Sequence, residues 1–181
     1  MGTRSLILLR HAEYHSGSGG GLNLTALGKK QARRSASVLG QESIDTVWSS
    51  TLLRAMETAN IVCDALSLPP PKTSSLLREG FPTQYHGLDV DDSQVAEDRA
   101  RADKAYSKFF RPSKRDRTEL LVCHGNLIRY FVACALRAKP ETWTRFITNN
   151  CGITRILIRP TGAVRVVSYN ECEHLRPHLL T

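Results

Sequence analysis

Short apolar runs alternate with longer mixed segments along this chain, and their lengths distinguish strands from helices. Residues 5–9 and 119–123 are short, mainly apolar runs, which are typical of strands buried on both faces of a sheet. Residues 45–49 predict another strand, and a helix over about 52–66 follows it at once. Strands that alternate with helices in this way favour a parallel sheet.

The remaining segments extend the same pattern. Thr25 is the expected N-cap of a first helix, which starts at residues 24–25 and carries a stripe of apolar side chains. The prolines at 69–71 predict a rigid break but no domain boundary, because strands and helices resume beyond them. The alternation predicts a single α/β domain over residues 1–181, a three-layer α/β/α sandwich with a mostly parallel sheet. The further elements expected are a short strand near 72–76, a largely polar helix over about 91–110, helices over 126–136 and 140–147, and strands over 152–158 and 163–168.

The composition is that of an ordinary soluble globular protein, with 41% hydrophobic and 23% charged residues. No apolar stretch approaches the roughly 20 residues that cross a membrane, and no signal peptide is visible. We therefore expect a soluble, intracellular chain with no membrane span. Five cysteines without a Cys-x-x-Cys pair suit free thiols in a reducing compartment. No cluster has the spacing of a zinc site, so we expect neither metal nor cofactor.

The formal net charge is +8, and basic residues gather in two places. One interpretation is that they form ordinary solvated faces. The other is that they attract an anionic substrate, a phosphoprotein or an acidic membrane surface. No nucleic-acid motif accompanies the charge, so we expect no nucleic-acid partner. The first group is Lys29, Lys30, Arg33 and Arg34, and the second is Lys108, Arg111, Lys114, Arg115 and Arg117.

Two of the predicted strands end in a histidine. Arg10 and His11 follow the run at 5–9, and His124 follows the run at 119–123. Ligands of α/β proteins bind at the carboxyl ends of such strands. A guanidinium can bind a phosphoryl group through two hydrogen bonds, and an imidazole can attack it. A single histidine at a strand end is more often structural, but two of them favour a functional site.

Two further polar residues fall at the same predicted edge. Arg54 lies in the first turn of the helix after strand 45–49, and Glu79 follows the short strand near 72–76. The set suits phosphoryl transfer without a metal, because two arginines can neutralise the transferring oxygens. One histidine would attack and become phosphohistidine, and a second, protonated imidazole would donate to the developing charge. A carboxylic acid would protonate the leaving alkoxide and then activate water.

Four segments carry a resemblance to a known family. Residues 8–12, 24–32, 49–59 and 123–125 resemble the Arg-His signature, the first-helix motif, the second arginine motif and the second histidine motif of the histidine phosphatase superfamily. The segments occur in the family's order and span most of the chain. Because the superfamily includes phosphoglycerate mutases, the resemblance implies a phosphoglycerate mutase-like fold.

A narrower resemblance covers residues 10–15, 76–80, 124–130 and 149–154. These segments are similar to the member-five group of the phosphoglycerate mutase family, whose proteins are mitochondrial serine/threonine protein phosphatases. The resemblance implies a phosphoprotein substrate and a mitochondrial location. That group carries an N-terminal membrane anchor and a multimerisation segment rich in tryptophan and aspartate, and neither is found in this sequence. The implied site consists of His11 as nucleophile, Arg10 and Arg54 as phosphate ligands, Glu79 as proton donor and His124 as electrostatic partner.

Several assignments stay open at this stage. Tyr14 and His15 either line the substrate site or belong to a surface loop, and Asn126 either contacts substrate or satisfies backbone groups at a helix start. The glycine-rich segment 16–21 is either a mobile rim or a slack connection. A small-metabolite phosphatase or a phosphoglycerate mutase is the alternative enzyme, but mutases of this superfamily are longer and close over substrate with inserted segments. A non-catalytic scaffold is disfavoured by the intact set of polar residues, and the sequence leaves a homo-oligomer open.

Overall fold

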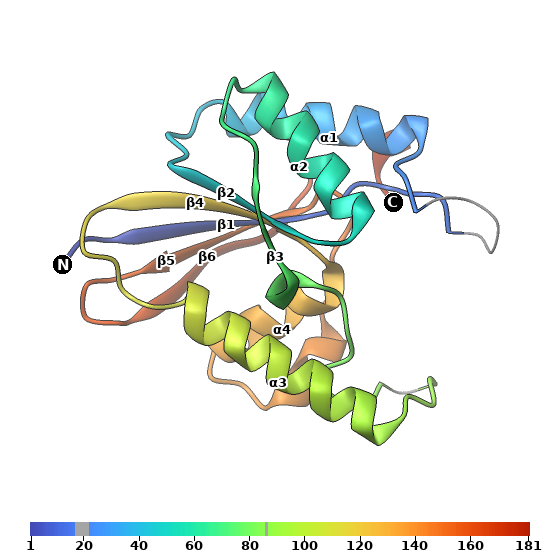
Figure 1. The fold of residues 1–181 in the computed structure, drawn as a ribbon, viewed down its shortest axis with the longest axis vertical. Coiled ribbons are helices and arrows are strands. Elements are labelled where there is room, and N and C mark those ends of the chain that lie inside the picture. Colours follow the sequence, from blue (N-terminus) through green and yellow to red (C-terminus); the bar gives the residue numbers. More distant parts are fainter. Residues whose placement is uncertain (17–21, 86) are drawn as a thin grey trace.

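A six-stranded mixed sheet forms the centre of the computed structural model, which describes residues 1–16, 22–85 and 87–181 (Figure 1). The strand order is β3-β2-β4-β1-β5-β6. β1 pairs in parallel with β4, β4 with β2, and β2 with β3, so four carboxyl ends meet at one edge of the sheet. The mostly parallel sheet is thus confirmed, with antiparallel pairing only between β1 and β5 and between β5 and β6. The strands are β1 Arg4–Arg10, β2 Thr46–Ser50, β3 Lys72–Ser74, β4 Arg117–Cys123, β5 Ile153–Ile158 and β6 Val164–Glu171.

Helices cover both faces of this sheet, as the three-layer prediction requires. α1 (Ala26–Leu39) and α2 (Leu53–Ala65) lie on one face, and α3 (Asp92–Phe109) and α4 (Gly125–Ala135) lie on the other (Figure 1). Three short 3-10 helices complete the described elements: η1 Ser75–Leu77, η2 Pro140–Arg145 and η3 Pro177–Leu179.

The side chains of β1 show why its apolar run has no polar face. Leu6 and Leu8 point into the core beneath α3 and α4, whereas Ile7 and Leu9 point into the core beneath α1 and α2. Successive residues of a strand face opposite sides, so a strand between two helical layers must be apolar throughout. After this apolar run the next polar residues are Arg10, the last residue of β1, and His11, which follows it.

Helix boundaries follow local capping signals. Thr25 is the N-cap of α1, as predicted, and its side chain accepts a hydrogen bond from Gly28 N. Asp91 caps α3 by accepting from Ser93 N and Gln94 N.

The helix predicted over 140–147 is wrong in type. The segment forms the 3-10 helix η2, closed by hydrogen bonds from Thr142 N to Lys139 O and from Phe146 N to Trp143 O. This tight turn places Trp143 wholly inside the core, where its indole N–H donates to Thr83 Oγ1 at 2.7 Å.

Within the described ranges, no helix has both the length and the apolar character needed to cross a membrane. All five cysteines are free thiols, and Cys63, Cys123 and Cys151 are buried.

Candidate active site

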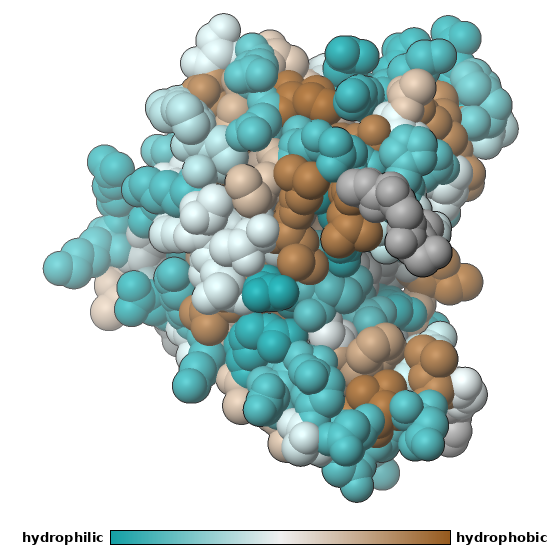
Figure 2. Space-filling model, turned by 45° about the vertical axis from the view of Figure 1, so that its right-hand side comes forward, coloured by the Kyte–Doolittle hydropathy of each residue, from teal (hydrophilic) through white to brown (hydrophobic). Residues whose placement is uncertain are grey.

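The carboxyl edge of the sheet brings together the polar residues that follow three strands. Arg54 Nε lies 3.1 Å from His11 Nε2, and the His11 and His124 rings are 5.1 Å apart between centroids. All three side chains are buried. Figure 2 shows the molecule turned toward this edge, where hydrophilic residues cross the middle of the surface between hydrophobic patches.

The hydrogen bonds of His11 identify its tautomer. Nδ1 lies 2.8 Å from the Ala12 carbonyl oxygen, which can only accept, so Nδ1 carries the proton. Nε2 therefore presents a lone pair, which accepts from Arg54 Nε. Burial lowers the pKa of His11 to about 3, and the nearby charges of Arg10 and Arg54 act in the same direction. The imidazole is neutral at physiological pH, as a nucleophile must be.

His124 is also neutral in this site. Burial lowers the pKa of His124, and the positive charges of Arg54 and Arg10 act in the same direction. The site without a bound anion therefore favours the neutral imidazole, and the protonated His124 expected during the reaction stays a prediction. Nε2 lies 2.8 Å from Ser50 Oγ, whereas Nδ1 is buried with no partner among the described residues. Neutral imidazole still has one N–H, so donation to a phosphoryl oxygen does not require prior protonation.

The guanidinium of Arg10 has one nitrogen that is hydrogen-bonded and another that has no partner among the described residues. Nη1 donates to the Thr148 carbonyl, and the buried Nε has no partner in the part of the chain that the structure describes. Burial lowers the pKa of Arg10, but an arginine remains charged. Gly125 lies against the guanidinium, and a Cβ at that position would be 3.3 Å from Arg10 Nε. The start of α4 therefore approaches Arg10 closely because residue 125 has no side chain.

Glu79 follows η1 and turns a carboxyl group toward these arginines. Its Oε1 is buried with no hydrogen-bond partner among the described residues. Burial raises the pKa of Glu79 to about 7, although Arg10, Arg54 and Arg129 act against the rise. A carboxyl group with this pKa can give up and take back a proton near neutral pH.

Arg129 is a site residue that the residue-by-residue reading of the sequence did not single out. It influences the pKa of both Glu79 and Arg10, and its guanidinium donates to Asn126 Oδ1 and to Phe146 O. The sequence does distinguish it, because Arg129 is the one charged residue in the largely apolar helix α4.

Tyr14 and Asn126 lie at the site, but in different roles. The Tyr14 ring meets His11 edge-on at 5.2 Å, and the Arg54 guanidinium lies 4.7 Å above the Tyr14 ring. Asn126 uses its side chain within the protein, since Nδ2 donates to Gly80 O at 3.1 Å and Oδ1 accepts from Arg129. The structural alternative stated for Asn126 is therefore the one that its contacts favour.

The other two open assignments concern His15 and the glycine-rich segment 16–21. The side chain of His15 is exposed. Residues 17–21 of the glycine-rich segment lie outside the described residues.

Three buried polar side chains hold the backbone that carries His11, and the sequence analysis assigned no site role to any of them. Thr58 Oγ1 accepts from Ala12 N at 3.0 Å, and Gln31 Oε1 accepts from Glu13 N at 2.8 Å. Asn150 Nδ2 donates to the His11 carbonyl at 2.9 Å. Thr58 and Gln31 lie on the buried faces of α2 and α1, where a polar residue needs a partner.

The site gathers positive charge without metal ligands. α2 and α4 both begin at this edge, and neither has a side-chain N-cap, so their N-terminal N–H groups and dipoles favour an anion here. Among the described residues, no three His, Cys, Asp or Glu side chains form a group that could hold a metal ion. The three arginines and the helix ends suit a phosphoryl group.

Comparisons with known proteins agree with this geometry. The sequence profile of the histidine phosphatase superfamily (branch 1) matches residues 6–108 and 93–171. A mitochondrial serine/threonine-protein phosphatase, Pgam5 of Caenorhabditis elegans, is 38% identical over 190 residues, which cover 99% of this chain and 66% of the relative. Its Homo sapiens counterpart is 32% identical over 193 residues, with the same coverage of 99% and 66%. The chain thus spans about two thirds of the length of these curated relatives.

Solved structures show the same fold. A phosphoglycerate mutase from Plasmodium falciparum superposes with a TM-score of 0.68 at 30% identity, over 98% of this chain and 96% of that one. A putative alpha-ribazole-5'-P phosphatase from Escherichia coli gives a TM-score of 0.74 at 21% identity, over 93% and 96% of the two chains. The phosphoglycerate mutase-like architecture is therefore confirmed.

Proposed function

Because this chain belongs to the histidine phosphatase superfamily (branch 1), we propose that it hydrolyses phosphoserine and phosphothreonine in proteins through a phosphohistidine on His11. One observation carries the proposal most directly. His11 is neutral, its Nδ1 proton is bound to the Ala12 carbonyl, and its Nε2 lone pair faces the Arg54 guanidinium. A phosphoryl group bound to Arg54 would therefore lie in front of the nucleophilic nitrogen.

The first step forms the phosphoenzyme. Arg10 and Arg54 bind the phosphoryl oxygens, and His11 Nε2 forms a bond to phosphorus as the bond to the serine oxygen breaks. Glu79 gives its proton to that oxygen, which leaves as the alcohol. His124 donates its N–H to the charge that develops on the phosphoryl oxygens.

The second step returns the enzyme to its starting state. Glu79, now a carboxylate, takes a proton from water while the water oxygen bonds to phosphorus. The bond from phosphorus to Nε2 breaks, and its electron pair returns to His11. Inorganic phosphate leaves, and Glu79 is again protonated. The positive charge that the transition states need comes from arginines, so a metal is not required in either step.

The relatives' names support the protein substrate, and they support a mitochondrial location for this chain as well. We treat residues 1–181 as one catalytic domain. The proposal is compatible with both a monomer and a homo-oligomer. The alternative function is a phosphatase or mutase for small phosphorylated metabolites. It is favoured by the likeness to the Plasmodium falciparum phosphoglycerate mutase at 30% identity.

Rapid quenching with a radiolabelled substrate tests the proposal. A phosphoserine peptide and 3-phosphoglycerate would be offered side by side, and acid-labile label on the protein would be counted. We expect label from the peptide in the wild type and none in His11→Ala, with His15→Ala as the control because that neighbouring histidine is exposed. Labelling from 3-phosphoglycerate alone would favour the metabolite enzyme, and label retained in His11→Ala would exclude His11 as nucleophile.

A further inference from the structure

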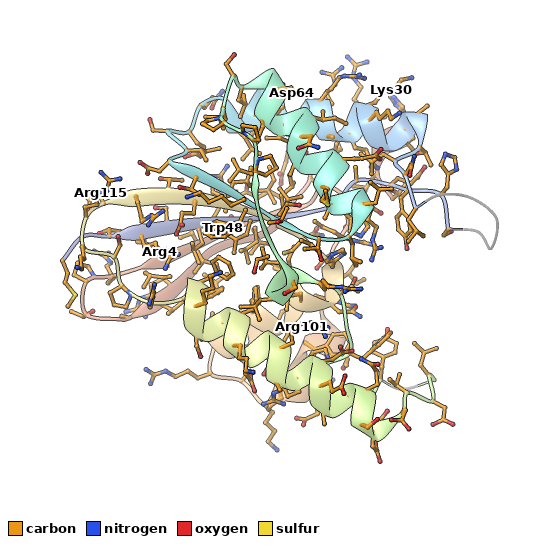
Figure 3. All side chains as sticks on the ribbon, viewed as in Figure 1. Arg4, Lys30, Trp48, Asp64, Arg101 and Arg115 are labelled. Atoms are coloured by element: carbon orange, nitrogen blue, oxygen red, sulfur yellow. The ribbon has the colours of Figure 1, made fainter. Side chains whose placement is uncertain are left out.

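Two side chains of α3 bind the backbone on either side of Gly80. Arg101 Nη2 donates to the Glu79 carbonyl oxygen at 2.9 Å, and Asp98 Oδ2 accepts from Phe81 N at 2.8 Å. Arg101 extends from α3 toward the segment after η1 (Figure 3). The segment that carries Glu79 is thus attached to α3 through one carbonyl and one N–H.

The two α3 side chains also bind each other. Arg101 Nη2 forms an ion pair with Asp98 Oδ1 at 2.5 Å, and Gln94 Nε2 donates to the same oxygen at 3.1 Å. Asp98 is only 4% exposed. A buried carboxylate is costly unless its hydrogen bonds are satisfied, and here both of its oxygens are occupied.

Gly80 allows this close approach, and α4 completes it from another side. A Cβ at Gly80 would overlap the side chains of Asp98 and Arg101. Asn126 of α4 donates to Gly80 O at 3.1 Å. Residues 79–81 are therefore held by side chains from two helices, with no room for the segment to shift toward α3.

The Glu79 carboxyl group itself is held less directly. Its Oε1 has no hydrogen-bond partner among the described residues. Arg10, Arg54 and Arg129 act on Glu79 as charges, and the Gly80 N–H acts on it as a hydrogen-bond donor. The place of the carboxyl group is consequently set mainly by the backbone that carries it.

We propose that Asp98 and Arg101 are positioning residues for Glu79, which fix residues 79–81 so that the carboxyl group reaches the oxygen of the leaving group. This inference rests on the proposed function, in which Glu79 is the proton donor. Neither residue touches substrate. Proton transfer requires donor and acceptor within about 3 Å of each other, so a loosened segment weakens the acid before it weakens the nucleophile.

The leaving group separates these two effects. Serine alkoxide leaves poorly without a proton, whereas para-nitrophenolate leaves readily without one. If the hydrogen bonds from α3 to residues 79–81 are lost, phosphoenzyme should form more slowly from a phosphoserine peptide. The rate of its formation from para-nitrophenyl phosphate should change little. A general loss of structure would slow both reactions.

The experiment measures the burst of phosphoenzyme from both substrates in Arg101→Ala, Arg101→Lys and Asp98→Asn. The controls are Glu97→Ala and Lys104→Ala, which remove exposed charges from the same helix. For Arg101→Ala we expect a loss of about tenfold or more with the phosphoserine peptide, within the range that general acids contribute, and a change of less than about twofold with para-nitrophenyl phosphate. Arg101→Lys should recover part of the loss, because an ammonium can still donate to the Glu79 carbonyl.

A second readout is the pH profile of kcat/KM with the phosphoserine peptide. A Glu79 segment released toward water should lose the desolvation that raises its pKa, so the decline at high pH should begin at lower pH in Arg101→Ala than in wild type. Equal slowing of both substrates, or no change in either, would overturn the positioning role. Failure of the proposed function would be seen separately, as absence of acid-labile phosphoenzyme in the wild type.

Discussion

The hydrogen bond from Arg54 Nε to His11 Nε2 joins the proposed nucleophile to the group that would bind the substrate phosphoryl group. The lone pair that must attack phosphorus is an acceptor for Arg54 while no anion is bound. A phosphoryl group can replace the lone pair as the acceptor of the Arg54 hydrogen bond, because its oxygens accept from the guanidinium. Its phosphorus then faces Nε2. Tyr14, which lies beneath Arg54, keeps the guanidinium in this orientation.

Arg54→Lys tests this arrangement. Lysine keeps the charge but has no Nε–H beside His11 and cannot form two parallel hydrogen bonds to a phosphoryl group. We expect kcat/KM to fall by about 100-fold or more, roughly 3 kcal/mol in transition-state stabilisation, in steady-state assays. Arg34→Lys on the exposed side of α1 is the matched control. Unchanged kcat/KM in Arg54→Lys would place Arg54 outside the chemistry.

The pKa of Glu79 predicts the pH dependence of the reaction. The first step needs the protonated carboxyl group, whose pKa is raised to about 7. With a phosphoserine peptide, the rate of phosphoenzyme formation should be highest below pH 7 and decline above it. In Glu79→Gln, phosphoenzyme formation should be slower, and its rate should not decline above pH 7. Because substrate titration affects both proteins alike, the ratio of the two rates isolates Glu79, and a ratio that does not vary with pH would remove it from the acid role.

The same shift links Glu79 to folding stability. Its folded pKa of about 7 lies above the ordinary value of 4.5, so the folded state keeps the proton longer than the unfolded state. Stability from this group is full below about pH 4.5 and is lost as the pH rises toward 7. Relative to wild type, Glu79→Gln should gain about 2.5 kcal/mol in unfolding free energy between pH 5 and pH 8, measured by urea titration. A relative loss over that interval would show that the carboxylate stabilises the fold.

At the scale of elements, the site depends on how closely α1 meets the loop after β1. Gly28 lies in the first turn of α1, and a Cβ there would overlap the Glu13 carbonyl oxygen. Gln31, one turn later, accepts from Glu13 N. The helix therefore rests directly on the backbone that follows His11.

Gly28→Ala should separate α1 from this loop. We expect a loss of about 2–4 kcal/mol in unfolding free energy, typical of steric overlap with buried backbone, together with reduced phosphoenzyme formation. Gly40→Ala is the control, because the nearest atom to its new Cβ would be the tip of the flexible Leu66 side chain at 3.2 Å, and its φ of −64° suits alanine. Its unfolding free energy should stay within about 1 kcal/mol of wild type. Similar losses in both variants would mean that contact with Glu13 is not the cause.

These elements also show what could be predicted from sequence. Arg10, His11 and His124 could be found because they are polar residues where an apolar strand ends, and the layered α/β fold follows from the alternation of strands with helices. Asn150 could not be found in this way, since it binds the His11 carbonyl across 139 residues of sequence and only the folded sheet brings them together. The neutral state of His124 likewise comes from burial by the whole fold.

At the scale of the whole molecule, one of the two basic groups forms part of a defined surface. Lys30, Arg33 and Arg34 of α1 face Arg176 and His178 across a groove of about 490 Å³ that has no carboxylate among its lining residues. None of these lysine and arginine side chains forms an ion pair within the described part of the chain. With a net charge of +8, this surface adds to the positive potential that a phosphorylated substrate meets.

Ionic strength should therefore act on capture of the substrate. Between about 0.05 and 0.5 M KCl we expect kcat/KM for a phosphopeptide to fall about three- to tenfold, while kcat changes little, because salt screens long-range attraction more than contacts within the buried site. The double variant Lys30→Glu/Arg33→Glu should show a weaker salt dependence with the same kcat. If its salt dependence equals that of wild type, the groove does not contribute to attraction.

Arg10 and His11 end a strand that is completed from both ends of the chain. β1 lies between β4 and β5, Thr148 accepts from Arg10, and Asn150 holds the His11 carbonyl (Figure 1). Synthesis starts at the N-terminus and adds about 5–20 residues per second, so roughly 7–30 seconds pass between the translation of His11 and that of Asn150. A ribosome-bound chain that ends before Thr148 already contains His11, the proposed nucleophile, but lacks the residues that bind Arg10 and the His11 carbonyl. The proposed phosphatase site is thus incomplete during translation until β5 can join the sheet.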